Sequence, residues 1–218
     1  MTQEILFASL SIFLYFLGFI PYIYHVFHGR VVPHPFTWTI WFIFSVTNLF
    51  IFIETTGIEP TFYSILARTL ALFLGLSCGW WFLRKISLSA FDYVSLLLAL
   101  LVILAMYLFG LREAVILMVI IDIIVLLPTI KKIWREPRTE DALAWFTTAL
   151  SQGSLLMSLP FLSFENAFFW LYAICANLSV GLFIHLLIKK RESTLIGRVK
   201  YYVLMKKHDF LLALKNKL

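Results

Sequence analysis

Long apolar runs alternate with short polar segments along almost the whole chain. A helix that crosses a bilayer needs about 20 mainly apolar residues, because in lipid its backbone must satisfy its own hydrogen bonds. Seven runs meet this requirement, so we predict an all-α integral membrane protein with seven transmembrane helices. The predicted spans are residues 5–27, 36–53, 61–83, 91–109, 114–130, 142–159 and 166–188.

Composition supports the same class. Of the 218 residues, 61% are hydrophobic and only 14% are charged, whereas a soluble domain is about 25% charged. This excludes a secreted disulfide scaffold, a disordered tail and a free nucleic-acid-binding domain, in spite of the net charge of +6. Cys78 and Cys175 both lie inside apolar runs, so we expect them to be packing residues rather than a disulfide or metal ligands.

The basic residues predict the orientation. When loops are assigned alternately to the two sides, sixteen of the 18 lysines and arginines fall on one side. Positive charges concentrate in cytoplasmic loops. We therefore expect a multi-pass protein of the plasma or inner membrane, with the N-terminus outside and the C-terminus in the cytoplasm. The first run has no basic segment before it and is expected to be a retained helix rather than a cleaved signal peptide.

The chain also shows a weak internal repeat. An offset of 107 residues places Pro21 on Pro128 and Trp38 on Trp145, and superposes the first three predicted helices on the last three without a gap. Two parallel copies of an odd number of helices require one linking helix, which the fourth run supplies. We predict a 3+1+3 architecture. Its units are residues 1–88 for the first repeat, 89–112 for the linker helix, 113–190 for the second repeat and 191–218 for the tail.

Two segments resemble a known family. The stretch LPTIKKIWREPRTEDALAWF, residues 127–146, is similar to the motif of PQ-loop proteins, and IPYIYHVFHGRVVPHPFTW, residues 20–38, is a weaker copy. Where that motif has glutamine after the proline, this chain has Tyr22 and Thr129. The resemblance implies the fold of SWEET-like (MtN3-type) transporters and their relatives, with a central solute site between the two halves.

Polar and aromatic residues recur on one face of the second and sixth runs at helical spacing. Lipid-facing stripes are aliphatic, so we expect these faces to line a common cavity. Two alternatives remain: Trp38 and Trp145 could be interfacial belt residues, and the polar groups could make interhelical hydrogen bonds without a ligand. The stripe of the second run is Trp38, Trp41, Ser45 and Asn48, that of the sixth is Trp145, Thr148 and Gln152, and the first run repeats the pattern with Ser11, Tyr15, Gly18 and Tyr22. The candidate site residues among these are Tyr15, Trp38, Ser45, Asn48, Trp145, Thr148 and Gln152.

Two charges fall inside predicted spans, Asp122 in the fifth and Arg68 in the third. A charge at the centre of a bilayer costs about 3 kcal/mol on insertion scales and usually marks a substrate or proton path. The functional hypothesis is a gated Asp122–Arg68 pair that binds a polar substrate or is broken by a proton. The alternatives are a static ion pair, or Arg68 reaching out toward Glu54 or Glu59 while Asp122 stays neutral.

Three further features carry predictions. Asn177 resembles the asparagine that SWEET transporters use to bind sugar, and the resemblance implies the same role here. Pro21 and Pro128 each remove a helical hydrogen bond, and we expect hinges there rather than helix terminators because the positions repeat. The histidines at 25, 28 and 34 are too irregularly spaced for a metal site and are expected in a solvated loop.

The last residues differ from the rest of the chain. From Lys189 onward nine cations alternate with short apolar groups, and no apolar run is long enough to span a bilayer. This pattern is typical of a basic amphipathic helix that lies on the anionic cytoplasmic leaflet. We expect the tail to form such a helix.

These observations favour a small-solute transporter that works by alternating access between two three-helix bundles, with proton coupling through Asp122. The solute could be a sugar, an amino acid or another small polar metabolite. A PQ-loop-type receptor or sorting protein that binds without transport is the alternative. No catalytic set of side chains is recognisable, so no enzyme, cofactor or metal is expected. The expected partners are the lipid bilayer and the solute, without nucleic acid, and self-association is left open.

Overall fold

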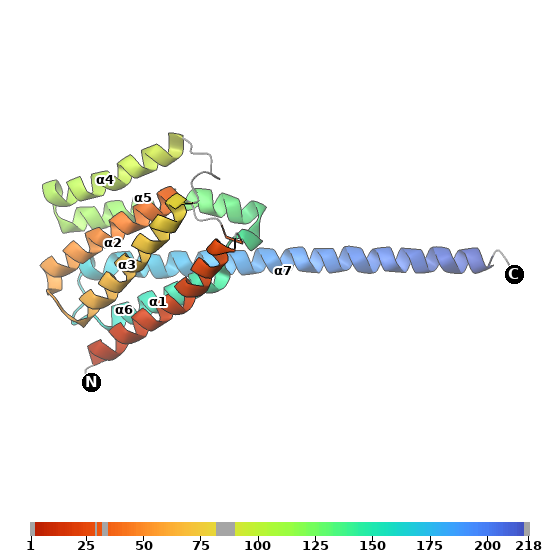
Figure 1. The fold of residues 1–218 in the computed structure, drawn as a ribbon, viewed down its shortest axis with the longest axis horizontal. Coiled ribbons are helices and arrows are strands. Elements are labelled where there is room, and N and C mark those ends of the chain that lie inside the picture. Colours follow the sequence, from red (N-terminus) through yellow and green to blue (C-terminus); the bar gives the residue numbers. More distant parts are fainter. Residues whose placement is uncertain (1–2, 29, 32–34, 82–89, 216–218) are drawn as a thin grey trace.

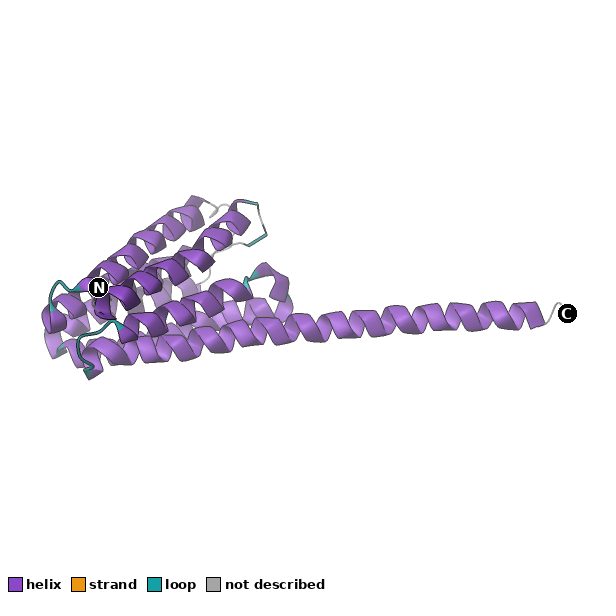
Figure 2. Cartoon of the chain, turned by 90° about the horizontal axis from the view of Figure 1, so that it is seen from below, coloured by secondary structure: helices purple, strands orange, loops and turns teal. Residues whose placement is uncertain are grey.

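A computed structural model describes residues 3–28, 30–31, 35–81 and 90–215 of the chain. Within these residues every regular element is helical (Figures 1 and 2). The α-helices are α1 (Gln3–Phe27), α2 (Pro35–Thr56), α3 (Pro60–Trp81), α4 (Ala90–Phe109), α5 (Leu111–Arg135), α6 (Ala142–Met157) and α7 (Phe164–Lys215), and a short 3-10 helix, η2 (Pro137–Thr139), joins α5 to α6.

Each α-helix coincides with one of the predicted apolar runs. Five of the helices, α1, α2, α3, α5 and α7, contain a stretch long and apolar enough to cross a membrane. Helix α4 contributes a shorter apolar stretch, Leu96–Phe109, and α6 has 16 residues. The prediction of an all-α, multi-pass membrane protein is confirmed at this level. Arg84, Lys85, His34 and the predicted unit boundary at residues 88–89 lie outside the described residues.

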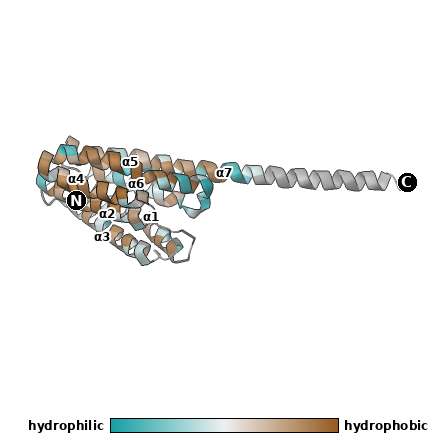
Figure 3. Ribbon diagram, turned by 90° about the horizontal axis from the view of Figure 1, so that it is seen from above, coloured by the Kyte–Doolittle hydropathy of each residue, from teal (hydrophilic) through white to brown (hydrophobic). Residues whose placement is uncertain are grey.

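The helices of the bundle consist mainly of hydrophobic residues (Figure 3), and many of these are exposed. Large hydrophobic side chains are more than half exposed on several helices, for example Phe13 and Ile20 on α1, Leu70 on α3 and Leu182 on α7. A water-soluble protein does not expose apolar surface on this scale. The exterior is therefore suited to lipid.

The helices form a closed ring. Helix α3 packs between α1 and α2, and α7 packs between α6 and α5. Helix α1 closes the ring on one side by packing along α6, and on the other side α4 packs against both α2 and α5. The chain thus brings its first and sixth helices side by side, although they lie more than 100 residues apart in the sequence.

Helix α1 meets α6 through a regular stripe. Its buried residues are spaced by three or four, which puts one face of the helix against the bundle. Gly18 makes the close approach possible, because a Cβ atom at this position would lie 1.9 Å from Thr147 Oγ1 and 3.1 Å from the Ala144 Cα atom. The buried stripe consists of Ala8, Ser11, Tyr15, Gly18, Tyr22 and Val26.

Pro21 and Pro128 lie inside their helices. Helix α1 continues past Pro21 to Phe27, and α5 continues past Pro128 to Arg135. The alternative that these prolines terminate helices is therefore wrong. Each one still leaves a carbonyl of the preceding turn without its usual partner, so each marks a weak point in a continuous helix.

Helix α7 extends far beyond the bundle (Figure 1). It runs without interruption from Phe164 to Lys215, and the chain end lies at the opposite end of the molecule from the N-terminus. At the exit, Arg191 donates to the Trp134 carbonyl oxygen and Arg138 pairs with Glu192. The tail is helical as predicted, and it continues the last membrane helix without interruption. No proline follows residue 160, and the lysines, arginines and glutamate at the exit all favour helix.

Candidate functional site

A cavity of about 370 Å³ lies in the middle of the bundle. Its walls come from α1, α2, α3, α5, α6 and α7, and aromatic side chains share them about equally with polar and charged ones. This size is at the lower end of the range for small-molecule sites. Nine of the ten predicted site residues line it, namely Tyr15, Trp38, Ser45, Arg68, Asp122, Trp145, Thr148, Gln152 and Asn177.

Asn48 is the predicted residue that does not line the cavity. It is buried, and its Nδ2 donates to the Phe44 carbonyl oxygen one turn earlier in the same helix. The helical spacing placed it on the correct face of α2. It lies about one turn beyond Ser45, which is the last residue of α2 in the cavity wall. The Asn48 amide therefore donates to a backbone carbonyl of its own helix.

The three tryptophans of the predicted stripe form a continuous aromatic wall. Trp41 stands edge-on to both Trp38 and Trp145, with ring centroids 5.9 Å apart in each pair. Trp38 and Trp145 are 6% and 8% exposed, which is not the position of belt residues facing lipid. Gly75 on α3 lets the Trp38 ring lie flat against that helix, since a Cβ there would approach the ring to 2.0 Å.

Polar side chains in each half pair with one another at the cavity wall. In the first half, Ser45 and Thr69 share a hydrogen bond of 2.7 Å between α2 and α3. In the second half, Asn177 Nδ2 donates to Gln152 Oε1 at 3.2 Å between α7 and α6. Asn177 and Gln152 therefore lie together at the cavity, and both reach it from helices of the second half. Thr148 donates to the Ala144 carbonyl of its own helix.

Asp122 is held by neutral donors. Its Oδ1 accepts from Trp41 Nε1 and its Oδ2 accepts from the Tyr172 hydroxyl, each at 2.9 Å. The side chain comes from the middle of α5, and its partners come from α2 and α7. Asp122 thus ties α5 to α2 and α7 at the wall of the cavity, and it forms no ion pair with another described residue.

Arg68 is held in a similar way by neutral groups. Its Nη2 donates to the hydroxyls of Ser11 and Ser151. The guanidinium carbon lies 5.3 Å from the ring centre of Tyr15 and 5.4 Å from that of Trp170, within the range of cation–π attraction. Arg68 is only 3% exposed, so the charge is buried among hydroxyls and rings.

The direct Asp122–Arg68 pair is not formed. Each of the two groups bonds to other side chains, although both line the same cavity. The alternative in which Arg68 reaches out to Glu54 or Glu59 is also wrong, because its guanidinium is bonded to Ser11 and Ser151 inside the bundle. The depths of Asp122 and Arg68 in their helices predicted that the two side chains could reach each other. In the folded bundle, neighbouring helices bring other polar side chains closer to each of them.

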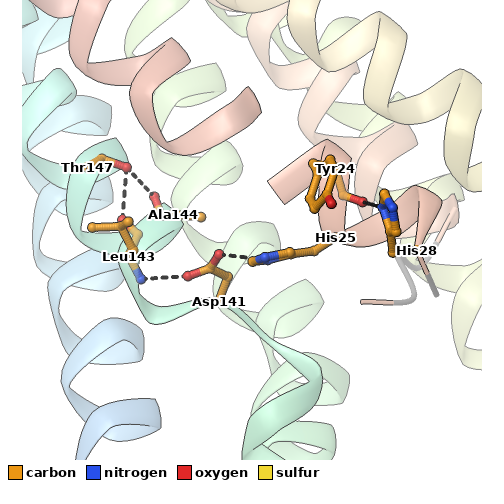
Figure 4. Close-up of polar contacts among 7 residues, drawn as sticks. All are labelled: Tyr24, His25, His28, Asp141, Leu143, Ala144 and Thr147. Carbon is orange, nitrogen blue, oxygen red and sulfur yellow. Dashed lines mark hydrogen bonds and ion pairs between the residues drawn. The ribbon is translucent and has the colours of Figure 1, made fainter. Parts of the chain in front are cut away.

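A different set of charges lies at the end of the cavity nearest the α5–α6 connection. Lys132 forms an ion pair with Glu140, and both residues line the cavity. Beside them, His25 Nδ1 lies 3.2 Å from Asp141 Oδ2 (Figure 4). Asp141 also caps α6 by accepting from the Leu143 backbone N–H.

His25 therefore links α1 to the start of α6. The prediction of a solvated loop position for this residue is wrong, because α1 continues past it and carries the ring to Asp141. His28 behaves differently, since its Nδ1 contacts the Tyr24 carbonyl oxygen of its own helix (Figure 4). Within the described residues no group of three His, Cys, Asp or Glu side chains is placed to hold a metal ion.

Several residues of the site were missed by the sequence analysis. Trp170 and Tyr172 lie near the start of α7, where an aromatic residue reads as part of an interfacial belt. Ser151 precedes the predicted Gln152 in α6, so its side chain points in a different direction around the helix. The helical spacing used for the stripe did not include it. Ser64 was also missed, whereas Ser11 belonged to the predicted stripe of the first run.

The chain was compared with protein-family models, with curated proteins and with solved structures, and none of the three comparisons found a match. The function must therefore be argued from the cavity itself.

Proposed function

We propose that the protein is a small-solute membrane transporter that binds its substrate in the central cavity. The observation that carries this proposal is the composition of that cavity. An apolar bundle encloses about 370 Å³ lined by amides, hydroxyls and the two buried charges, Asp122 and Arg68. Ionisable residues inside a membrane protein are costly, and they face bundle interiors where substrates or ions pass.

The order of the helices supports a mechanism of alternating access. Helices α1, α3 and α2 adjoin in that order, and α5, α7 and α6 adjoin in the corresponding order. Ser45 and Gln152 are 107 residues apart, which is the offset of the sequence repeat, and each pairs across to the third helix of its own group. We infer two parallel three-helix repeats joined by α4, with all seven helices crossing the membrane and the cavity between the groups.

The same arrangement supports the resemblance to SWEET-like and PQ-loop proteins. In this proposal the N-terminus lies outside and the C-terminus and the exposed part of α7 lie in the cytoplasm, as the basic residues predict. Pro21 and Pro128 then lie at equivalent depths near the cytoplasmic ends of α1 and α5. They serve as hinges about which that end of the cavity opens and closes.

Asp122 is the proposed site of proton coupling. Both of its oxygens accept from neutral donors, so no protein cation fixes its charge. A proton taken up from one side of the membrane would neutralise the carboxylate. When the cavity closes on that side and opens on the other, the proton would be released there. Asp122→Asn mimics the protonated form. We expect the variant to exchange solute across equal concentrations but to lose accumulation driven by a pH gradient.

The proposal is tested with the full chain reconstituted in liposomes. Shrinkage and recovery after an osmotic step, followed by light scattering, report permeation of unlabelled sugars, amino acids and small organic acids. A solute that permeates only protein-containing liposomes supports transport, and Asp122→Asn is then compared with Glu54→Gln, a matched change at an exposed acid outside the cavity. Recovery at the rate of empty liposomes for every solute would contradict transport.

A receptor or sorting protein is the second candidate. Helix α7 projects beyond the bundle as far as Lys215, which provides an extended surface that a transporter of this kind does not need for its cavity. A solute that binds the purified protein without permeating the liposomes would favour this alternative.

A further inference from the structure

Arg68 is the least compensated group in the described part of the chain. It is 3% exposed, and the groups around it are the hydroxyls of Ser11 and Ser151 and the rings of Tyr15 and Trp170. All of these are neutral. A buried cation is normally paired with a carboxylate, because desolvation costs more than hydroxyls and rings return.

The guanidinium also has donors to spare. It carries five N–H groups, and both of its hydrogen bonds leave from Nη2. Arg68 Nε is the buried side-chain nitrogen or oxygen that lacks a hydrogen-bond partner among the described residues. Leaving such a donor unsatisfied costs roughly 1–3 kcal/mol, and more for a charged group. A negatively charged acceptor would both neutralise the buried charge of Arg68 and accept a hydrogen bond from its Nε.

The serines around Arg68 hold it in place without neutralising it. Ser11 Oγ donates to the Ser151 carbonyl oxygen, and Ser151 Oγ donates back to the Ser11 carbonyl oxygen. Ser64 Oγ donates to Ser11 Oγ. The hydroxyl protons are therefore committed, and the oxygens are left to accept from Arg68. This fixes the guanidinium before a ligand arrives, which lowers the cost of binding.

We propose that Arg68 binds the carboxylate of a small organic acid, whose apolar or aromatic body lies against the tryptophan wall. A planar carboxylate matches the guanidinium fork. A dianion such as phosphate fits less well, because Asp122 shares the cavity and the cation at the other end, Lys132, is already paired with Glu140. The wall of Trp38, Trp41 and Trp145 offers an aromatic surface to the rest of the ligand.

Binding is tested on the purified, delipidated full chain in a neutral detergent by isothermal titration calorimetry. The probes are benzoate and 3-phenylpropionate, each compared with its own amide, which has the same shape and no charge. The acids are expected to bind at least about tenfold more tightly than the amides, as charge-assisted hydrogen bonds are stronger than neutral ones. Equal binding of acid and amide, or no binding by either acid, would overturn the proposal.

Variants test the assignment to this residue. Arg68→Gln should abolish the preference for acids, and Arg68→Lys, which keeps the charge but not the fork, should retain part of it. Arg112→Gln is the matched control, because it removes an exposed arginine outside the cavity, and it should leave the preference unchanged. An acid preference that survives in folded Arg68→Gln would overturn the assignment. If that variant does not fold, the comparison of acid with amide on the wild-type chain remains decisive.

A lipid headgroup could offer an anion to the same guanidinium. Added phosphatidylglycerol should leave benzoate affinity unchanged, and competition that requires Arg68 would overturn the assignment to a free acid. Binding of the acid at Arg68 does not depend on the proposed function. Only movement of the bound acid across the membrane rests on it. Binding of acids without flux in liposomes would leave the inference intact and remove transport, whereas flux of neutral solutes with no acid binding would do the reverse.

Discussion

The first three helices, here called one half of the bundle, and α5, α6 and α7, the other half, meet on two sides, and the two contacts are built from different residues. On one side α1 lies directly along α6, through Gly18 and the reciprocal hydrogen bonds of Ser11 and Ser151. On the other side α4 packs against both α2 and α5, and the contact is a large apolar cluster that includes Phe44 and Met118. The first contact is direct and contains paired hydroxyls, whereas the second is apolar and is largely made through α4.

The sequence repeat makes this difference informative. At the offset of 107 residues, Met118 occupies the position of Ser11, and Phe44 occupies the position that corresponds to Ser151. Equivalent places in the two halves thus carry hydroxyls on one side and apolar side chains on the other. Arg68 lies on the hydroxyl side. The cavity is therefore polarised: Arg68 lies at the hydroxyl wall, whereas the other cation of the lining, Lys132, is paired with Glu140.

The largest effect is expected on the apolar side. Phe44 is 1% exposed, and Phe44→Ala would leave a space that its neighbours cannot fill. We expect a loss of about 3–5 kcal/mol in stability, measured by unfolding of the purified protein in detergent. Phe50→Ala is the matched control on the same helix, because Phe50 is 54% exposed and its loss leaves no internal space. Equal losses in the two variants would contradict the packing described for α2.

At the contact between α1 and α6, the corresponding test enlarges a side chain instead of truncating one. Gly18→Ala places a methyl group 1.9 Å from Thr147 Oγ1, and the backbone of α6 at Ala144 is too close for a simple side-chain shift. We expect a loss of about 1–3 kcal/mol, with α1 displaced from α6. Gly153→Ala is the control, since its Cβ would meet nothing within 4 Å, and it should be neutral or stabilising. Thermal unfolding of both variants gives the comparison.

The helices were largely predictable from the sequence, and their arrangement was not. Apolar runs locate helices because lipid admits few other structures, and the start of α6 at Ala142 was predicted to the residue. The sequence did not show that α7 continues without a break beyond residue 190. The charged residues there indicate that the segment leaves the bilayer, but they do not indicate whether the helix is interrupted.

The same limit applies to the site. Helical periodicity placed Tyr15 and the residues of α2 and α6 at the cavity, because period and polarity together define a face. Asp122 and Arg68 were found as charges inside predicted spans, and Asn177 through the family resemblance. It could not give the partners of Arg68 or Asp122, since these depend on which helices are neighbours around the ring. Ser151, Trp170 and Tyr172 reach the two charges from α6 and α7, and no spacing within one helix reveals a contact between helices.

A smaller effect is expected when the hydroxyl side loses one group. Ser151→Ala removes an acceptor from Arg68 and one of the two reciprocal bonds to α1. We expect a loss of about 1–2 kcal/mol in stability and weaker binding of benzoate. Ser77→Ala is the control, because Ser77 is exposed and donates only to the Phe73 carbonyl of its own helix. Unchanged stability in Ser151→Ala would mean that the serine network does not hold α1 to α6.

The smallest effect is expected where the α1–α6 contact reaches the end of the bundle. His25 of α1 contacts Asp141, which caps α6, so His25→Gln removes a link between the two halves. The two side chains are 31% and 15% exposed, and ion pairs of this kind contribute about 0–1 kcal/mol. Unfolding of the purified protein should therefore change little.

His28→Gln provides the matched control, because the contact of His28 among the described residues is with Tyr24 of its own helix (Figure 4). If the halves separate at this end during transport, His25→Gln should alter the rate of solute movement in liposomes more than His28→Gln does, at nearly equal stability. Equal rates in the two variants would show that the contact between His25 and Asp141 does not control separation.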